Sequence, residues 1–446
     1  MARGNFDINV GKTRPGNYVN VKSVRQQKPK GSTRGIALLP LIGYNWGPDA
    51  KFIKLTAEAP DKEIVKFGHS VYDDNDFMLL IRECMKRAST CYVYIINPGT
   101  KAKITEEGLT VTAVYGGDRG NSIKVGCTAN TAGGFDVTVY LDNAVVEKYT
   151  NLSTVKDLIS AAERKYVVFS AENEDAELTA FAVKGLTGGT AGEVTNDMVT
   201  KFLDQSETVK WNTMCFPVEE DSLQTACQTK IKYFRENVGK GVQAVLPNAK
   251  SDHEGIINVT NAVMVDGRAL TPAQACAWVA GATAAADKTE SLTYVEYDGA
   301  EEVVGIKTHE ESELAIKNGE FFFSVSEEGK VVVEYDINSL HTFTTEKTAD
   351  YAKNRVMRVY DSFSEDLALT FPPNKYDNST DGWLIMEGIG KTLLKNYNED
   401  GAIDNVDLDN DFYVDRSRSA GDETFFCVGL QAVDSAEKLY FTVATR

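Results

Sequence analysis

The sequence lacks the patterns by which cysteine builds a disulfide or zinc framework. Its seven cysteines are an odd number, they are scattered, and no two of them form a C-x-x-C pair. Disulfide-rich secreted domains and zinc modules depend on paired cysteines at short spacings. We therefore exclude both classes and expect a protein that is made and folded in a reducing cytoplasm.

Long apolar runs are also missing. The longest, "IALLPLIG", is too short to span a bilayer and contains Pro40. The first ten residues, "MARGNFDINV", have no apolar core of the kind found in a secretory signal. We expect neither direct membrane insertion nor a secretory leader.

Positive charge is in short supply. The 47 Lys and Arg stand against 65 Asp and Glu, which gives a formal net charge of −18. A general nucleic-acid binder needs clustered Lys and Arg for its phosphate contacts, so that class is excluded. The composition is otherwise that of a globular protein, and 446 residues are enough for two or three domains with their own cores.

Catalytic and ligand-binding motifs are few, and each has a plainer interpretation. The string "GGDRGNSIKV" (116–125) resembles a phosphate-binding glycine loop, but a strand pattern follows it instead of a helix, which favours a hairpin or bulge. His253, in "SDHEG", stands between two carboxylates as a metal ligand or acid–base residue would. We interpret it as an exposed loop histidine.

The remaining candidates for chemistry are weaker still. The acidic run "EDGAIDNVDLDND" (399–411) has the composition of a calcium loop, but it lacks the glycine and the final glutamate of an EF-hand. Cys215 and Cys276 lie in apolar contexts and are expected in the core. No nucleophile, base and orienting residue form a visible set, and we predict no catalytic residue, no metal and no cofactor.

The order of the predicted elements indicates an α/β protein with an insertion. Strand and helix patterns alternate from "RGIALLPLIG" to "CYVYIIN" (91–97), give way at about 100–190 to short alternating strands, and resume after the loop "GLTGGTAG" (185–192). This order predicts a doubly wound, mostly parallel core with an inserted antiparallel β-rich domain. The expected parts are an N-terminal arm and linker strand (1–24), the core (25–98 and 191–345), the insertion (99–190) and a C-terminal domain with a terminal β arm (346–446).

One helix can be predicted in detail. In "TPAQACAWVAGATAAAD", Thr271 is placed as the N-cap, Pro272 as the first helical residue and Gln274 as the capping-box partner. Ala277, Gly281 and Ala285 recur at every fourth position. We expect another backbone to lie close to that face.

Both ends of the chain have β-strand character. "NYVNVKSV" (17–24) alternates near the start, and the chain stops on "EKLYFTVATR" (437–446), in which every second residue is apolar. No turn follows the last strand, so it must pair with something or leave a sticky edge.

Taken together, these segments resemble the sheath proteins of contractile phage tails, including those of defective prophages and R-type bacteriocins. The resemblance runs in order along nearly the whole chain, through "RPGNYVNV" (14–21), "RGIALLPLIGYNWGP" (34–48), "GGDRGNSIKV" (116–125), "LTGGTAGEVTNDMVTKFLD" (186–204), "AWVAGATAAADKTESLTY" (277–294), "ELAIKNGEFFF…VVVEYDINSL" (313–340), "NRVMRVYDSF" (354–363) and "LQAVDSAEKLYFTV" (430–443).

The resemblance implies a structural protein with a subtilisin-like core, and the protease motifs H-G-T-H and G-T-S-M-A are absent from the sequence. Subunits of this family polymerise as hexameric rings around a tail tube, with baseplate and tail terminator proteins at the ends, and they contract without nucleotide hydrolysis. Such a protein is expected in the host bacterial cytoplasm during assembly and then in the tail of a virion or bacteriocin particle.

The resemblance also implies that the terminal arms complete the sheets of neighbouring subunits, an exchange known as β-strand addition. The predicted contact residues are Tyr18, Val19, Val21, Leu439, Tyr440, Phe441 and Val443. Because a head-to-tail contact does not close on itself, it generates a helical array.

The helical segment "WLIMEGIGKTLLKNYNEDG" is the candidate for facing the tube, through Lys391 and Lys395. A core helix with two solvated lysines is the alternative. Two alternatives to a sheath also stay open, a degenerate subtilisin-like hydrolase and a soluble, monomeric binding module whose end strands pair with each other.

Overall fold

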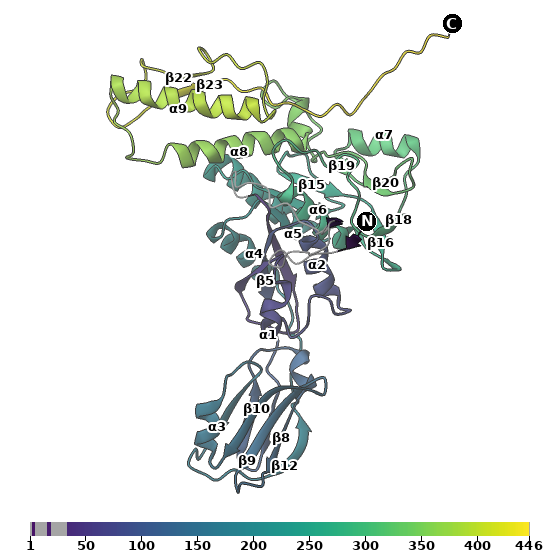
Figure 1. Cartoon of the computed structure of the whole chain (residues 1–446), viewed down its shortest axis with the longest axis vertical. Coiled ribbons are helices and arrows are strands. Elements are labelled where there is room, and N and C mark those ends of the chain that lie inside the picture. Colours follow the sequence, from purple (N-terminus) through teal and green to yellow (C-terminus); the bar gives the residue numbers. More distant parts are fainter. Residues whose placement is uncertain (1, 5–15, 19–33, 446) are drawn as a thin grey trace. The chain divides into compact units, whose positions relative to one another are not determined.

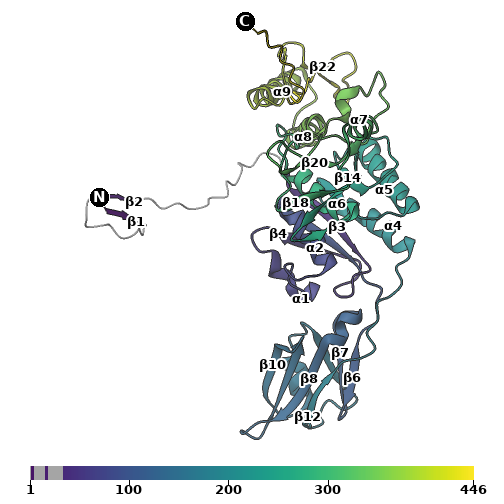
Figure 2. The same ribbon diagram turned by 90° about the vertical axis from the view of Figure 1, so that its right-hand side faces the viewer.

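The computed structural model describes residues 2–4, 16–18 and 34–445. The chain divides into two units, residues 1–33 and 34–446. In the first unit, β1 (Ala2–Gly4) pairs in parallel with β2 (Gly16–Tyr18), as Figure 2 shows beside the N-terminus. The strand predicted for residues 17–24 is thus present at its first two positions, and its remainder lies outside the described residues.

A seven-stranded sheet forms the centre of the second unit (Figure 1). The strand order is β19-β15-β14-β13-β3-β5-β4, and every neighbouring pair is parallel except β4–β5. The longest parallel pair joins "IALLPLI" and "TCYVYII", whose apolar residues point to both faces, as in sheets covered on both sides. The strands are β3 (Ile36–Ile42), β4 (Lys51–Thr56), β5 (Thr90–Ile96), β13 (Thr213–Cys215), β14 (Gln243–Pro247), β15 (Ile256–Val259) and β19 (Glu320–Phe321).

Helices cover both faces of this sheet. The neighbouring residues Leu38 and Leu39 of β3 belong to two different hydrophobic clusters, because alternate side chains of a strand point to opposite faces. On one face lie α2 (Asp76–Met85) and α6 (Pro272–Ala285), and on the other lie α4 (Asn196–Gln205) and α5 (Asp221–Tyr233). The predicted mixed α/β core with a mostly parallel sheet is confirmed.

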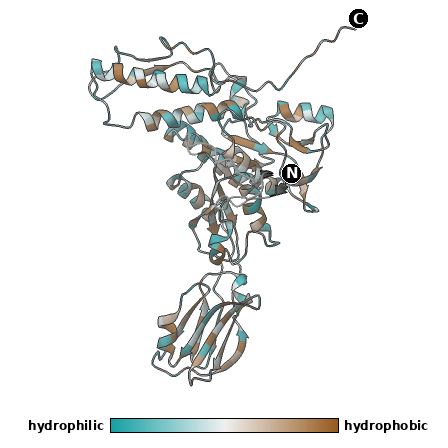
Figure 3. Ribbon diagram, in the orientation of Figure 1, coloured by the Kyte–Doolittle hydropathy of each residue, from teal (hydrophilic) through white to brown (hydrophobic). Residues whose placement is uncertain are grey.

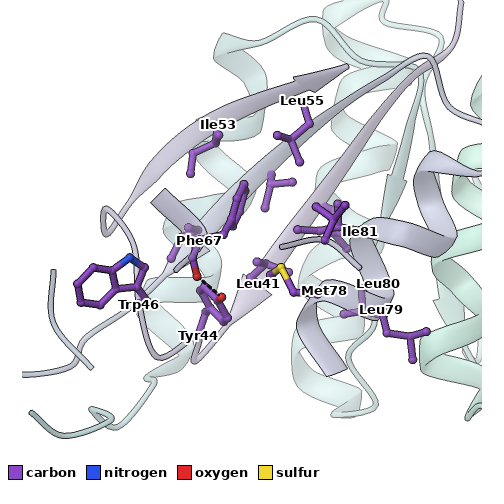
Figure 4. Packing of buried hydrophobic residues seen from close by; sticks show 14 of the residues in the cluster. Leu41, Tyr44, Trp46, Ile53, Leu55, Phe67, Met78, Leu79, Leu80 and Ile81 are labelled. Atoms are coloured by element: carbon purple, nitrogen blue, oxygen red, sulfur yellow. Dashed lines mark hydrogen bonds between the residues drawn. The ribbon is translucent and has the colours of Figure 1, made fainter. Parts of the chain in front are cut away.

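The larger cluster also takes in the chain that follows β3. Figure 4 shows Leu41 beside Met78 of α2, and Tyr44 close to Phe67, the last residue of α1 (Ile64–Phe67). The Tyr44 hydroxyl donates a hydrogen bond to the Phe67 carbonyl. Burial raises the pKa of Tyr44 well above its ordinary value, so the phenol stays protonated and keeps donating.

The predicted details of α6 are present. The Thr271 hydroxyl accepts from the Gln274 N–H, the Gln274 side chain accepts from the Thr271 N–H, and Pro272 is the first helical residue. Gly281 lies so close to α2 that a Cβ added to it would collide with the Cys84 carbonyl. The small-residue face therefore receives another backbone, as the spacing predicted.

An antiparallel β structure is inserted between β5 and α4. It has a four-stranded sheet in the order β10-β9-β8-β12 and a three-stranded sheet in the order β11-β7-β6, visible as the blue to teal part of Figure 1. Its elements are β6 (Lys103–Glu106), β7 (Leu109–Ala113), β8 (Ile123–Ala129), β9 (Phe135–Leu141), β10 (Ala144–Leu152), α3 (Val155–Ala161), β11 (Val167–Ala171) and β12 (Phe181–Gly185).

The "GGDRGNSIKV" string differs from its predicted form. Residues Asp118–Ser122 make a short 3-10 helix before β8, not a hairpin or bulge. The Arg119 guanidinium donates to the Gly68 carbonyl at 2.7 Å and to the Asp142 carboxylate at 2.6 and 2.9 Å. The string therefore fastens the insertion to the core, because one side chain bonds to both.

Shorter elements complete the core. The hairpin predicted to turn at Glu328-Gly329 is confirmed, because β20 and β21 pair antiparallel across it. The strands are β16 (Ala262–Val265), β17 (Arg268–Ala269), β18 (Ala300–Val304), β20 (Phe323–Val325) and β21 (Val331–Val333), with α7 (His309–Lys317).

The C-terminal part has a separate hydrophobic cluster. The helices α8 (Asn354–Thr370) and α9 (Thr380–Glu399) pack with a two-stranded antiparallel sheet of β22 (Phe412–Val414) and β23 (Phe426–Val428). Gly390 of α9 lies directly against the Phe412 ring. None of the helices in the described ranges is both long and apolar enough to cross a bilayer.

We expect Gly281→Ala to destabilise the protein. Alanine favours a helix by about 1 kcal/mol over glycine, but the added methyl group must push α2 and α6 apart, which costs about 1–3 kcal/mol. Urea unfolding of the full chain measures the difference. The matched control is Gly388→Ala on α9, where nothing lies within 4 Å of the added carbon. This variant should be neutral or slightly stabilised, and an equal loss in both variants would contradict the close packing.

Candidate assembly surfaces

The last described residues are apolar and exposed. The exposed fractions of Leu439, Tyr440, Phe441 and Val443 are 66%, 90%, 83% and 85%. No strand or helix is present from residue 433 to 445. In Figure 1 these residues end the yellow trace at C, and we call residues 438–445 the C-terminal arm. The predicted strand is not formed within the chain, and so large an apolar surface is typical of an interaction site.

Glu437 fixes the root of this arm to the body. Its carboxylate is only 9% exposed. The Ser291 and Thr293 hydroxyls donate to Oε1 over 2.9 and 2.7 Å, and the Lys353 ammonium donates to Oε2. We call these four residues the Glu437 clamp.

Lys353 is buried to about the same extent as Glu437. Its side chain is 8% exposed, and its ammonium lies 3.9 Å from the centre of the Tyr335 ring. Burial alone lowers the pKa of Lys353, but the hydrogen bond and the charge of Glu437 outweigh it and leave the pKa raised. Lys353 therefore keeps its positive charge over the whole neutral range.

The chain before the clamp is also fixed by backbone pairing. The Asp404 N–H donates to the Gln431 carbonyl at 3.0 Å, and the Val433 N–H donates to the Ala402 carbonyl at 2.9 Å. Backbone pairing and the clamp thus hold the C-terminal segment as far as Glu437, and the arm begins one residue later.

The structure describes only one of the three contact residues predicted near the N-terminus. Tyr18 is the last residue of β2, while Val19 and Val21 lie outside the described residues. In the described part of the chain, β2 pairs with β1 along one edge and has no partner on the other.

The sheet of β22 and β23 has two outer edges. In an antiparallel pair of strands, residue pairs that exchange backbone hydrogen bonds alternate with pairs that do not. The Asp415 N–H donates to the Phe425 carbonyl, and the Gly429 N–H donates to the Asp411 carbonyl. Tyr413 and Cys427, which lie midway between these two bonds, are therefore also a hydrogen-bonded pair. The outer edge of β22 is formed by Phe412 and Val414, and that of β23 by Phe426 and Val428.

One of these edges is blocked and the other is open. The Val414 N–H, on the β22 edge, donates to the Glu387 carboxylate at 2.9 Å, and the other oxygen of Glu387 lies 3.6 Å from Arg416. Within the described residues, the main-chain groups of Phe426 and Val428 on the β23 edge have no partner. Val428 is also 37% exposed, so β23 is the edge that another strand can reach.

The two lysines predicted to face the tube lie on α9, and both have partners. Lys395 is 62% exposed and 3.7 Å from Glu399, and Lys391 is 33% exposed and 4.0 Å from Asp409. Leu384 and Ile385, earlier on the same helix, are 54% and 56% exposed, and Figure 3 shows hydrophobic stretches along α9. The sequence interpretation omitted these two apolar residues.

His253 is not the exposed histidine that the sequence suggested. Its side chain is 14% exposed, and Nδ1 accepts from the Gly255 N–H at 2.9 Å. Nε2 lies 3.7 Å from Glu254 and 4.0 Å from Glu236 without a hydrogen bond. Burial lowers the pKa of His253, so it is neutral at pH 7. The Ser339 hydroxyl bonds only to the backbone of His253, so the pair is no nucleophile and base.

The two cysteines and the acidic run considered in the sequence analysis have structural roles. Cys215 and Cys276 are fully buried, as predicted. In the acidic run, the Asp407 carboxylate accepts from the Asp409 N–H and the Asn410 side chain, so it caps its own loop. In the described ranges, no group of three or more His, Cys, Asp or Glu is placed to hold a metal ion.

Comparison with known proteins gives a single family. The phage tail sheath protein β-sandwich domain matches residues 97–195, the phage tail sheath protein central domain matches 192–339, and the phage tail sheath C-terminal domain matches 346–446. The chain belongs to the phage tail sheath family.

Individual relatives agree with this membership. The phage-like element PBSX protein XkdK of Bacillus subtilis is 35% identical over 99% of both chains. The crystal structure of the sheath tail protein of Desulfitobacterium hafniense is 37% identical, covers 96% of this chain and 99% of its own, and superimposes with a TM-score of 0.83. The helical sheath of the anti-feeding prophage in its contracted state, at 12% identity and a TM-score of 0.57 over 98% of this chain, shares the fold.

As a tail sheath protein, the chain has a structural role in the tail of a phage-like particle. Inter-subunit contacts at the apolar chain ends stay a prediction from the sequence, and the Glu437 clamp was not predicted. The sequence signal for the clamp is a carboxylate directly before a segment in which every second residue is apolar. The partners of Glu437 lie at positions 291, 293 and 353, and no pattern in the sequence identifies them.

We expect Glu437→Gln to loosen the root of the arm. The variant keeps the shape of the side chain but removes the buried carboxylate that pairs with Lys353, and leaves only the half-exposed Asp434, 3.6 Å away, to balance the Lys353 charge. This should lower the free energy of unfolding by about 1–3 kcal/mol. Hydrogen exchange should accelerate at the Asp404 and Val433 amides, which bond to the segment before the clamp. The control is Glu399→Gln, whose carboxylate is 62% exposed, and which should change stability by less than about 0.5 kcal/mol. Unchanged exchange in Glu437→Gln would show that the clamp does not hold the arm.

Proposed function

We propose that this chain is the subunit of a contractile tail sheath. It polymerises as hexameric rings in a helical array around a tail tube and contracts to drive that tube through a bacterial envelope. The observation that carries the proposal is the C-terminal arm, which follows the Glu437 clamp, forms no strand within the described residues and exposes 66% to 90% of its apolar side chains Leu439, Tyr440, Phe441 and Val443.

The arms join subunits by adding strands to neighbouring sheets. Ordering ten free residues costs roughly 10–20 kcal/mol of backbone entropy, and each new backbone hydrogen bond returns only about 0.5–1.5 kcal/mol. Burial of apolar side chains must therefore supply the remaining favourable free energy of binding. Leu439, Tyr440, Phe441 and Val443 supply it on one arm, and Tyr18, Val19 and Val21 supply it on the other.

The open edge of β23 is the receiving site for such a strand. Its main-chain groups face outward, and its neighbour β22 is backed by α9 through Phe412. A two-stranded sheet is marginal by itself, so a third strand would stabilise it as well as link two subunits.

Contraction follows from this arrangement without nucleotide chemistry. Assembly on the tube holds the subunits in an extended lattice, and new contacts between rigid bodies drive the change to a wider one. The arms act as hinges, and the C-terminal one starts directly after Glu437. The energy is stored in contacts between subunits, which agrees with the lack of a P-loop motif in the sequence.

The remaining partners and the place of action follow the same proposal. The partners are the tail tube, the baseplate and the tail terminator, and neither nucleic acid nor membrane insertion is required. Subunits assemble in the host bacterial cytoplasm and end in the tail particle. The mostly parallel sheet with helices on both faces supports a subtilisin-like core that has lost its protease chemistry.

Deleting residues 439–446 tests the proposal and leaves the clamp in place. The variant should stay folded and lose no more than about 0.5 kcal/mol of stability, because the removed side chains are exposed in the monomer. It should form no tubes by electron microscopy under conditions in which the intact chain does. A monomeric binding module whose ends pair with each other would instead lose stability. Tubes of normal length from the truncated chain would refute the role of the arm.

Charge reversal on α9 tests the tube-facing surface. We expect Lys395→Glu and Lys391→Glu each to weaken binding to the tube about five- to tenfold, because each reverses a charge on the proposed contact. Co-sedimentation with preformed tubes measures the effect. Lys232→Glu on α5 is the matched control, since Lys232 is 60% exposed and 3.9 Å from Glu236, four residues on. If all three variants bind alike, the lysines of α9 are only solvated.

A further inference from the structure

His253 lies at a point where three parts of the body meet. Residues 252–255, which we call the His253 loop, connect β14 to β15 of the central sheet. A Cβ added to Gly255 would lie 2.7 Å from the Ile231 side chain, so the loop packs directly against α5. The Ser339 hydroxyl, in the segment that leads to α8, donates to the His253 carbonyl at 3.0 Å. The loop therefore joins the sheet, α5 and the approach to the C-terminal part.

The hydrogen bond at the His253 ring decides where its proton lies. Nδ1 accepts from the Gly255 N–H at 2.9 Å, so the proton of the neutral ring is on Nε2. Within the described residues Nε2 has no hydrogen-bond partner, although Glu254 Oε2, a buried acceptor without a partner of its own, is 3.7 Å away. A second proton would have to bind at Nδ1 and would face the Gly255 N–H. The ring therefore cannot be protonated while this bond persists.

Charged groups face the ring from each element that packs against it. The carboxylates are Glu254 in the loop and Glu236 just after α5, and the cations are Lys347 and Arg235. Burial has the largest effect and lowers the pKa of this histidine, and the two cations add to it against the two carboxylates. Lys347 donates to Glu254 at 2.8 Å, and Arg235 donates to both oxygens of Asp361 on α8 at 2.9 and 3.0 Å. These bonds hold both cations near the ring and keep it neutral.

The same loop holds the segment 341–347 at both of its ends. Asp252 accepts from the His341 N–H at 2.8 Å and from the Thr342 N–H at 3.1 Å, and the His341 ring lies 3.5 Å from the same carboxylate. At the other end of the segment, Lys347 bonds to Glu254. A movement of the His253 loop would therefore release this segment from the sheet and from α5.

We propose that the His253 loop is a latch that acid opens: the neutral ring closes the loop through Gly255, and uptake of one proton from solvent at Nδ1 breaks that bond and frees the segment 341–347. No covalent bond changes. The imidazolium can then turn toward Glu236, whose side chain is 44% exposed. The inference goes beyond the proposed sheath function, because it concerns a single chain and requires no assembly.

The direction of the pH effect follows from the two states of the loop. In the open loop the histidine has its ordinary pKa of about 6.5, and in the closed loop its pKa is lowered by burial. The closed loop is therefore fully stabilised above about pH 6.5. Each pH unit below that value favours the open loop by up to about tenfold, until the pH reaches the pKa of the closed form. Burial alone raises the pKa of Glu254, but the hydrogen bond from Lys347 outweighs it and leaves the pKa lowered, so this carboxylate stays charged in the same range.

Hydrogen exchange of the full chain, resolved to single amides and corrected for the intrinsic effect of pH, measures the opening. Between about pH 7 and about pH 5 we expect the amides of Gly255, His341 and Thr342 to lose protection by about fivefold or more. The reference amides are Phe77 and Met78, which bond to the Asn75 side chain, an acceptor that does not titrate. They should change by less than about twofold. An equal loss at both sets of amides, or no loss at Gly255, overturns the proposal.

His253→Asn removes the proton site and keeps the acceptor, because the Asn carbonyl oxygen takes the place of Nδ1. This variant should keep its protection at both pH values. His309→Asn is the matched control, since His309 is 88% exposed, and it should respond to pH like the unmodified chain. A pH response that persists in His253→Asn overturns the proposal. Should that variant not fold, His341→Asn decides: a response that survives supports His253, and one that disappears assigns the proton to His341 and overturns the proposal.

Discussion

The ion pair between Glu437 and Lys353 marks the boundary between the packed body of this protein and its exposed C-terminal arm. A carboxylate that is 9% exposed must be satisfied by donors, and two hydroxyls and an ammonium do this. Because the clamp holds its backbone in place, only the residues beyond it lose freedom when the arm binds a neighbour. In the proposed polymer, the entropy cost of each link would therefore be limited to a short segment.

The clamp is rigid because a buried network supports it. The Asp336 carboxylate accepts from the Leu292 N–H at 2.9 Å, between the two clamp hydroxyls, and from the Arg358 guanidinium of α8 at 2.6 Å. Both charged side chains are almost completely buried. Removing either partner would leave an uncompensated charge in the core, so the loop, the helix and the root of the arm are held as one body. A force on the arm is thereby transmitted to the core of the subunit.

The sequence predicts the parts that obey local rules. The apolar strands β3 and β5 and the capping box of Thr271 follow from periodicity and side-chain chemistry, and the spacing of Gly281 predicts its close packing. The parts that were wrong or missed depend on residues distant in sequence. His253 is buried by elements that its neighbours do not reveal, and Glu437 binds residues more than 80 positions away. The blocked edge of β22 likewise depends on Glu387 of α9.

The two edges of the β22–β23 sheet differ, and this difference bears on how the proposed lattice would be joined. Strand pairing is directional, and it tolerates many side chains because the backbone supplies its bonds. With one edge closed by Glu387 and the other open, a strand can join in one place only. If the C-terminal arm pairs with a neighbouring sheet as proposed, the residue directly after the Glu437 clamp could change its dihedral angles while the bonds on either side persist. If the arms keep the same partners throughout the proposed contraction, its free energy must come from contacts between the faces of the subunit bodies.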